Sequence, residues 1–307
     1  MTVVDGSGNI PSGIIKSYTA KSLAEYIERL GLIKAKNDLC FRGLSKSSYR
    51  LVPSLDRGIS KEEPLRKWSE QEYNLVEFAE QRFPDSFVKQ TPALLVANMQ
   101  HYGIPTRMMD LTGNALVALF FACEKEDNED GQVIVFDEKT VSAYNPYVNV
   151  IADTYRLTKN APMEIETYRY IVYKQQYFSS MIYPGWENDN NGIDDVNLDL
   201  LKRPIIVDVG SLNQRQINQS GKFIVFPNSF YKDKNGKEYI SNHLIKMEKN
   251  SDFIKAIINI PKDSKKKIID KLKLAGITKD FLFPDNTDAV CESIKQSVQN
   301  RIYYINN

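Results

Sequence analysis

The sequence is poor in the residues that build disulfide frameworks and metal centres. Its 307 residues include three cysteines, Cys40, Cys123 and Cys291, and only two histidines. An odd number of widely separated cysteines fits neither a set of disulfides nor the paired ligands of a zinc site. We therefore expect reduced, packed thiols and no metal site.

A charge excess and long apolar runs are also missing. The chain has 40 basic and 39 acidic residues, a formal net charge of +1, so any binding of nucleic acid or membrane needs a local patch. The longest apolar runs, such as residues 115–123, are shorter than the roughly 20 residues that cross a bilayer, and the N-terminus lacks a basic segment followed by an apolar one. We expect a cytoplasmic protein without membrane contact.

Motifs of two large enzyme classes are absent as well. There is no Gly-x-Ser-x-Gly elbow of a serine hydrolase, and no glycine-rich phosphate loop followed by Lys-Ser or Lys-Thr. Serine hydrolysis and nucleoside triphosphate hydrolysis are therefore disfavoured as functions.

The composition present, 42% hydrophobic and 26% charged, is that of an ordinary globular protein. Residues 1–16 are expected to form an N-terminal tail, and residues 17–300 a single domain with a variable middle segment at about 140–200. The patterns predict an α+β fold, a mixed sheet with flanking helices. Helical spacing and caps predict helices at 22–30, 62–83, 91–101, 114–124, 265–274 and 288–298, and apolar runs predict strands at 38–44, 132–137, 204–209, 222–226 and 253–260.

The most informative stretch is residues 100–112, where polar groups are concentrated in an otherwise apolar run. The stretch begins at the C-terminus of a predicted helix and then becomes extended, because Pro105 disfavours a helical residue before it. Its polar side chains are of the types that bind and polarise ligands. They belong to His101, Tyr102, Thr106, Arg107, Asp110 and Thr112. We expect this stretch to form one wall of a pocket.

Four blocks of the sequence together resemble the FRG domain family. They occur in the order that the family has, and they cover about residues 20–295. The departures are modest: Met108, Met109 and Leu111 stand where the family commonly has Leu-Leu and Trp, and Lys222 lies inside the third block. The blocks are Phe41-Arg42-Gly43, residues 100–112, Arg215 with residues 219–223, and Leu282-Phe283-Pro284-Asp285.

The order of these blocks is similar to that of ADP-ribosyltransferases, which place an arginine on an early strand and a ribose-binding residue before a late one. The resemblance implies a related fold and a toxin of bacterial anti-phage defence that transfers ADP-ribose from NAD to a nucleic acid, RNA rather than DNA. It also implies an antitoxin protein as a partner. A shared fold does not determine function, so the residues of the site decide whether this function applies. Two alternatives use the same pocket: a non-catalytic module that binds a nucleotide-like ligand, and an NAD glycohydrolase.

Transfer of ADP-ribose passes through an oxocarbenium-like state and needs cations for the diphosphate, polar groups for the riboses and an aromatic face for nicotinamide. The resemblance places these roles on particular residues. The expected catalytic residues are Arg42, His101, Arg107 and Gln219. The expected NAD-binding residues are Arg42, His101, Tyr102, Thr106 and Gln219.

Each of these residues also has a structural interpretation. Arg42 could pair with an internal carboxylate, and His101 could bind the last carbonyls of its helix. Asp110 and Thr112 suit helix capping, so we expect them to hold the site and Arg107 to be the more functional group.

The late block leaves further alternatives. Arg215 and Gln219 could belong to a solvated turn. An amide such as Gln219 binds a ribose but cannot act as a base, so a proton acceptor has to come from elsewhere, for example from Asp110. The lysine-rich run at 262–273 is usually the exposed face of a helix, yet it is the best local patch for nucleic acid in the sequence.

Overall fold

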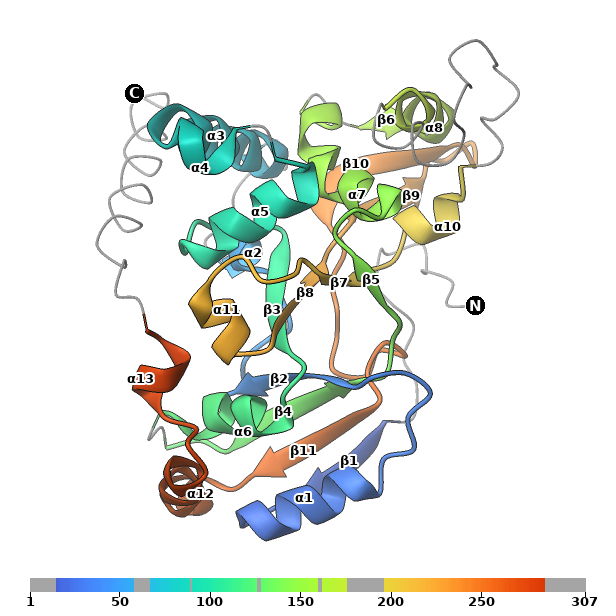
Figure 1. Ribbon diagram of the computed structural model, residues 1–307. Coiled ribbons are helices and arrows are strands. Elements are labelled where there is room, and N and C mark those ends of the chain that lie inside the picture. The colour runs from blue at the N-terminus through green and yellow to red at the C-terminus, as the bar shows by residue number, and fades with distance from the viewer. Residues whose placement is uncertain are drawn as a thin grey trace.

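A computed structural model describes residues 15–57, 67–88, 90–125, 128–159, 162–175 and 196–284. Its main element is an eight-stranded mixed sheet in the order β1-β11-β4-β2-β3-β8-β7-β5, beside a three-stranded sheet in the order β6-β10-β9 (Figure 1). Helices pack against the large sheet, so the fold is α+β, as the sequence predicts.

The strands are β1 (Lys16–Thr19), β2 (Cys40–Leu44), β3 (Met108–Thr112), β4 (Gly131–Phe136), β5 (Thr140–Ser142), β6 (Met163–Glu164), β7 (Ile205–Asp208), β8 (Gly221–Val225), β9 (Asn228–Lys232), β10 (Glu238–Leu244) and β11 (Ala256–Ile260). The helices are α1 (Leu23–Gly31), α2 (Ser54–Arg57), α3 (Lys67–Arg82), α4 (Pro84–Phe87), α5 (Pro92–His101), α6 (Ala115–Cys123), α7 (Pro146–Leu157), α8 (Ile165–Tyr173), α10 (Leu198–Leu201), α11 (Gln214–Asn218), α12 (Lys262–Leu274) and α13 (Lys279–Leu282).

The large sheet consists of two halves that diverge between β2 and β3. Strand β2 pairs with β4 along its whole length, but it pairs with β3 only between Phe41 and Thr112. Strand β3 in turn pairs with β8 along its whole length. In Figure 1 the strands β2, β4 and β11 cross the lower part of the molecule, and the antiparallel pair β3 and β8 lies above them. The backbones of β2 and β3 therefore separate beyond one residue pair.

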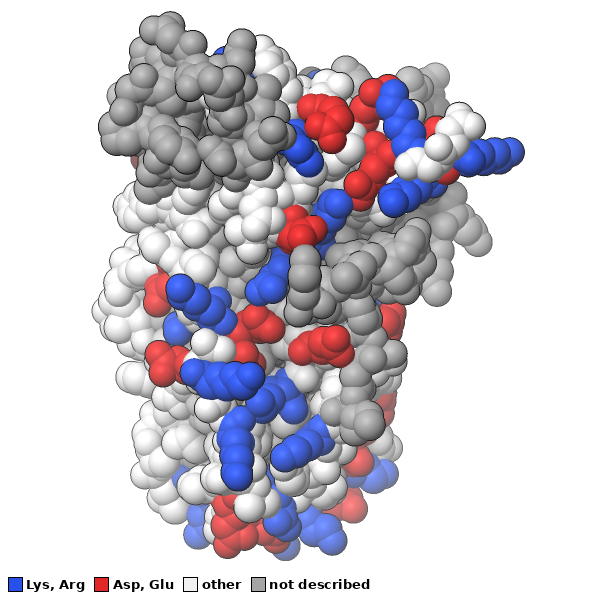
Figure 2. Space-filling model, turned by 90° about the vertical axis from the view of Figure 1, so that its right-hand side faces the viewer, with Lys and Arg blue, Asp and Glu red and all other residues white. Residues whose placement is uncertain are grey.

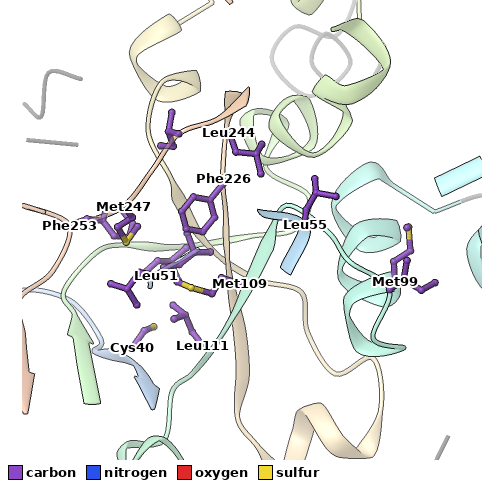
Figure 3. Packing of buried hydrophobic residues seen from close by; sticks show 14 of the residues in the cluster. Cys40, Leu51, Leu55, Met99, Met109, Leu111, Phe226, Leu244, Met247 and Phe253 are labelled. Atoms are coloured by element: carbon purple, nitrogen blue, oxygen red, sulfur yellow. The ribbon is translucent and has the colours of Figure 1, made fainter. Parts of the chain in front are cut away.

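Buried apolar residues form three clusters. One lies between α6, α12 and the β4–β11 half of the sheet, and a second lies between α5, α7 and the strands β7 and β8. The third fills the junction of the two halves, where Cys40 of β2, Met109 and Leu111 of β3 and Phe226 meet (Figure 3). Close packing in this third cluster thus holds β2 and β3 in place where they diverge.

Two glycines allow helix α6 to lie close to the sheet. A Cβ atom on Gly43 would lie 2.0 Å from the carbonyl oxygen of Ala118, and one on Gly131 would lie 2.2 Å from that of Ala122. Helix α6 is capped by Asn114, whose side chain accepts from two backbone N–H groups of the first turn, and its body is apolar. The third residue of the Phe-Arg-Gly block is therefore needed for packing.

The structure differs from the sequence predictions in several segments. Residues 214–218, expected in a polar stretch between strands, form helix α11, and the middle segment contains the partly buried helices α7 and α8. Strand β1 begins at Lys16, inside the expected tail, and α12 begins at Lys262. The helix predicted at 288–298 and residues 176–195 of the middle segment lie outside the described residues. Among the described helices, none has the length and apolar character to span a membrane.

Candidate functional site

A cleft of about 710 Å³ lies where β2 and β3 separate. Its floor is formed by residues 41–44 of β2 and 110–112 of β3. Its walls come from the irregular segment and short helix at 45–57, from the end of α6, and from Arg215 and Gln219 at α11. The volume is within the range of pockets that enclose nucleotide-sized ligands, roughly 300–1,000 Å³.

Arg42 lies in the floor of the cleft, with 14% of its side chain exposed. Its Nη1 atom donates a hydrogen bond to the backbone carbonyl oxygen of Asp110, at a position where β2 and β3 no longer pair. The same Nη1 atom lies 3.8 Å from the Oδ2 atom of the Asp110 side chain. Its buried Nε atom has no hydrogen-bond partner among the described residues. Burial lowers the pKa of Arg42 to about 10; the Asp110 carboxylate opposes this shift and Arg57 adds to it. The charge of Arg42 is therefore only partly compensated.

Among the described residues that line the cleft, basic side chains outnumber acidic ones. The basic residues are Arg42, Arg50, Arg57, Lys125 and Arg215, and the acidic ones are Asp110 and Glu124. On the face of the molecule shown in Figure 2, by contrast, acidic and basic side chains are interspersed. A chain with almost no net charge thus has a local cationic cleft, and a cleft of one sign attracts ligands of the other.

Asp110 lies on the open side of this floor. Its side chain is 58% exposed, and its Oδ2 atom accepts a hydrogen bond of 3.2 Å from the amide of Gln100. Asp110 and Thr112 were both expected to hold the site in place, and the contacts of Thr112 fit this role better than those of Asp110. The Thr112 hydroxyl accepts a hydrogen bond from the backbone N–H of Asn114 and donates one to the carbonyl oxygen of Gln219 at 2.6 Å. Thr112 therefore joins β3 to both α6 and α11, whereas Asp110 remains accessible to a ligand.

Arg107 does not lie in the cleft, which corrects the expectation that it is a catalytic residue. Only 1% of the residue is exposed. Its Nε and Nη2 atoms form a bidentate pair with the carboxylate of Glu72 at 2.8 and 2.6 Å, and its Nη1 donates to the carbonyl of Ile151 and the side chain of Asn228. With its donors used inside the core, Arg107 joins α3 and α7 to the segment before β3.

Thr106 is also an interior residue, which corrects its expected role in binding NAD. Its hydroxyl donates to the Oε1 atom of Gln100 at 2.8 Å and accepts from the backbone N–H of Met108. The Ser54 hydroxyl contacts the same Gln100 oxygen at 2.9 Å. These bonds fix the helix α2, and with it Arg57, beside β3.

His101 and Tyr102 are not brought together with Arg42. His101 is the last residue of α5 and Tyr102 is its C-cap, and their rings lie edge to face with centroids 5.1 Å apart. The Tyr102 ring also lies edge to face with the Phe87 ring, with centroids 5.8 Å apart, and packs against the apolar cluster at the junction of the two sheet halves. Neither residue is among the described residues that line the cleft. The predicted cluster of His101, Tyr102 and Arg42 is therefore not formed.

Arg215 and Gln219 do reach the cleft from α11, on the side of Thr112. The Gln219 amide nitrogen donates to the carbonyl oxygen of Leu282 at 2.8 Å, and the Arg215 guanidinium lies over the Phe283 ring at 4.7 Å. The third sequence block thus contacts the second through Thr112 and the fourth through Leu282 and Phe283. The structure places Arg42, Arg215 and Gln219 at one cleft.

Several residues that line the cleft were not expected from the sequence, among them Tyr49, Arg50, Arg57 and Lys125. The first three of these lie in residues 45–57, which follow the Phe-Arg-Gly block and contain only the short helix α2. The sequence signal that could have found them is a pair of arginines, Arg50 and Arg57, in a segment near that block that has no strand or long-helix pattern. Loop segments of this kind often carry binding residues. In the described part of the chain, no cluster of His, Cys, Asp and Glu could hold a metal ion.

Comparison with known protein families finds a match over part of the chain. Residues 37–131 match the family model described as FRG domain. This stretch contains β2, β3 and α6, and it supplies Arg42, Arg57 and Asp110 to the cleft. No curated protein and no solved structure matches the chain.

Proposed function

We propose that this chain, which contains an FRG domain, binds NAD in the cleft between β2 and β3 and transfers its ADP-ribose to a nucleic acid, with RNA as the favoured acceptor. The observation that supports this most directly is Arg42, a mostly buried guanidinium whose Nε has no hydrogen-bond partner among the described residues, in a cleft whose described lining includes five basic side chains. The diphosphate of NAD offers the oxyanions that a guanidinium binds best.

In the transfer, the bond between C1′ of the nicotinamide ribose and the pyridinium nitrogen breaks, and nicotinamide leaves as a neutral base with both electrons of that bond. An oxygen or nitrogen of the acceptor forms the new bond to C1′ and gives up its proton. We assign this proton to the exposed carboxylate of Asp110, since Gln219 cannot accept one. Gln219 and Arg215 then bind the riboses and the phosphates from the opposite wall.

The motif resemblance supports the wider assignment to a toxin that acts in the cytoplasm, where NAD and RNA occur together, and that an antitoxin protein restrains. Two other functions use the same cleft. Water in place of the acceptor gives an NAD glycohydrolase, and binding without bond cleavage gives a nucleotide-sensing module. The exposed Asp110 beside the cationic floor favours the transferase over a purely binding module.

The test uses NAD labelled on its adenylate phosphate, incubated with the purified protein and with RNA or DNA, while released nicotinamide is measured in parallel. We expect label on RNA and an equal amount of nicotinamide. Arg42→Gln should lower both rates about 10-fold or more, because a hydrogen bond to a charged group contributes about 1.5–3 kcal/mol. The matched control is Arg203→Gln, which removes an arginine paired with Glu138 outside the cleft.

The other outcomes separate the alternatives. Nicotinamide release without labelled RNA or DNA indicates a glycohydrolase. NAD that binds but yields no nicotinamide in any mixture refutes both enzymatic functions and leaves the binding module.

A further inference from the structure

A smaller pocket of about 230 Å³ shares a wall with the cleft. Both hollows are lined by the segment that includes Ser48, Tyr49 and Arg50. The far side of the smaller pocket is formed by residues 246–249. Ser48, Tyr49 and Arg50 therefore form a ridge between the two hollows, which we call the Tyr49 ridge.

The Tyr49 ridge combines an exposed aromatic ring with exposed cations. Tyr49 is 43% exposed, and Arg50 next to it and Lys246 across the smaller pocket are exposed as well. Arg50 lies 3.6 Å from the Asp56 carboxylate, and the charges of both Arg50 and Lys246 act on that carboxylate. The two cations thus lie near one another: Arg50 lines both hollows, and Lys246 lines the smaller pocket.

The backbone of the ridge is held in place from several sides. Leu51 forms a β-bridge with Met247, and the ammonium of Lys249 donates to the carbonyl oxygen of Ser47. The backbone N–H of Ser47 also donates to the carbonyl of Asp130 at 2.7 Å. A platform that is already ordered loses little entropy when a ligand binds.

We propose that the Tyr49 ridge is a docking surface for single-stranded nucleic acid. One base stacks on the Tyr49 ring, the phosphates beside it contact Arg50 and Lys246, and the adjoining nucleotide extends over the cleft. The inference rests on the proposed function, since the acceptor has to reach the cleft that holds NAD. Stacking on an exposed aromatic ring together with cations along the backbone is the general mode of single-strand binding, and paired bases are not available for it.

Helix α12 is the competing surface, because it carries the lysine-rich run. One of its lysines, Lys265, is buried and donates to the carbonyl of Ser45, and Lys273 lies 3.7 Å from the carboxylate of Asp270. Among the described residues that line the cleft and the smaller pocket, none comes from α12. Of these two described surfaces, the ridge is favoured because it combines an aromatic ring, cations and contact with the cleft.

The test measures fluorescence anisotropy of a labelled 12-nucleotide single-stranded RNA, and of the same RNA as a duplex, with the full chain and without NAD. Tyr49→Ala should weaken single-strand binding about 5-fold to 100-fold, and Tyr49→Phe should retain it, because the ring is kept. Lys246→Gln should reduce the slope of log Kd against log salt concentration by about 0.7. Tyr170→Ala, which removes a 49% exposed tyrosine on α8, is the matched control and should change Kd less than twofold.

Any one of three results overturns the proposal. The first is unchanged single-strand binding by Tyr49→Ala, and the second is equal binding of the duplex by the wild type. The third is a loss of RNA binding in the α12 double variant Lys267→Gln with Lys271→Gln, when Tyr49→Ala still binds. The last result assigns nucleic acid to α12. A wild-type protein that labels RNA, with Tyr49→Ala labelling it equally well, refutes the ridge and leaves the transferase intact. RNA binding on the ridge without NAD turnover refutes the transferase and leaves the ridge.

Discussion

Replacing Arg107 with methionine tests whether this arginine belongs to the core or to the site. The substitution leaves the Glu72 carboxylate, of which 4% of the side chain is exposed, without its bidentate partner. Removing one member of a buried ion pair costs about 3–5 kcal/mol of unfolding free energy, since the remaining charge stays desolvated. For a chain of this size, each kcal/mol of lost unfolding free energy lowers the Tm by about 2 °C or more. The Tm of Arg107→Met should therefore fall by at least about 6 °C.

The assay is urea unfolding followed by circular dichroism, combined with an NAD titration at a temperature well below unfolding. The double variant Arg107→Met with Glu72→Met should recover most of the lost stability, because an apolar pair of similar volume replaces the ion pair without an unpaired charge. NAD affinity should stay within twofold in the folded variants. An Arg107→Met protein with wild-type stability and no NAD binding would refute the placement of Arg107 in the core.

Two further predictions concern the scaffold. Gly43→Ala should destabilise the protein by about 3 kcal/mol or more, because its Cβ meets the backbone of α6, whereas Gly31→Ala, with open space around the new Cβ, should change the Tm little. Burial alone would raise the pKa of Asp137, but hydrogen bonds from Asn37, Lys36 and Lys255 bring it below its usual value. Asp137→Asn should therefore be less stable than wild type at pH 7, and the difference should shrink as the pH falls below about 4, where the unfolded carboxylate takes up its proton; a difference independent of pH would contradict this.

Much of the fold could be predicted where local signals are strong. Helix α1 begins after Ser22, whose side chain accepts from the Glu25 backbone, and α6 begins after the Asn114 cap. Helix α11 was missed because it is five residues long and has no apolar face, so neither periodicity nor composition distinguishes it from a polar loop. Short helices of this kind are stabilised by tertiary contacts, here by those that Asn218 and Gln219 make with α13.

The site was predicted in part, and the errors have a physical cause. Arg42 and Gln219 were found because a motif block names them, and the structure places both at the cleft. The prediction for Arg107 rests on its place in the polar stretch 100–112, and it is wrong because its partner Glu72 lies 35 residues earlier, in a helix whose polar face the sequence does not orient. Whether a charged residue inside a motif block faces the core or the cleft depends on the tertiary structure, here on the divergence of β2 and β3.

The central claim is that the cationic floor around Arg42 binds the diphosphate of NAD. Isothermal titration of NAD into the wild-type protein, Arg42→Gln and the control Arg203→Gln tests it directly. The account predicts one site on the wild type, an affinity about 10-fold or more lower in Arg42→Gln, and an affinity within twofold of wild type in the control. Equal NAD affinity in wild type and Arg42→Gln, or no binding to the wild type, would contradict it.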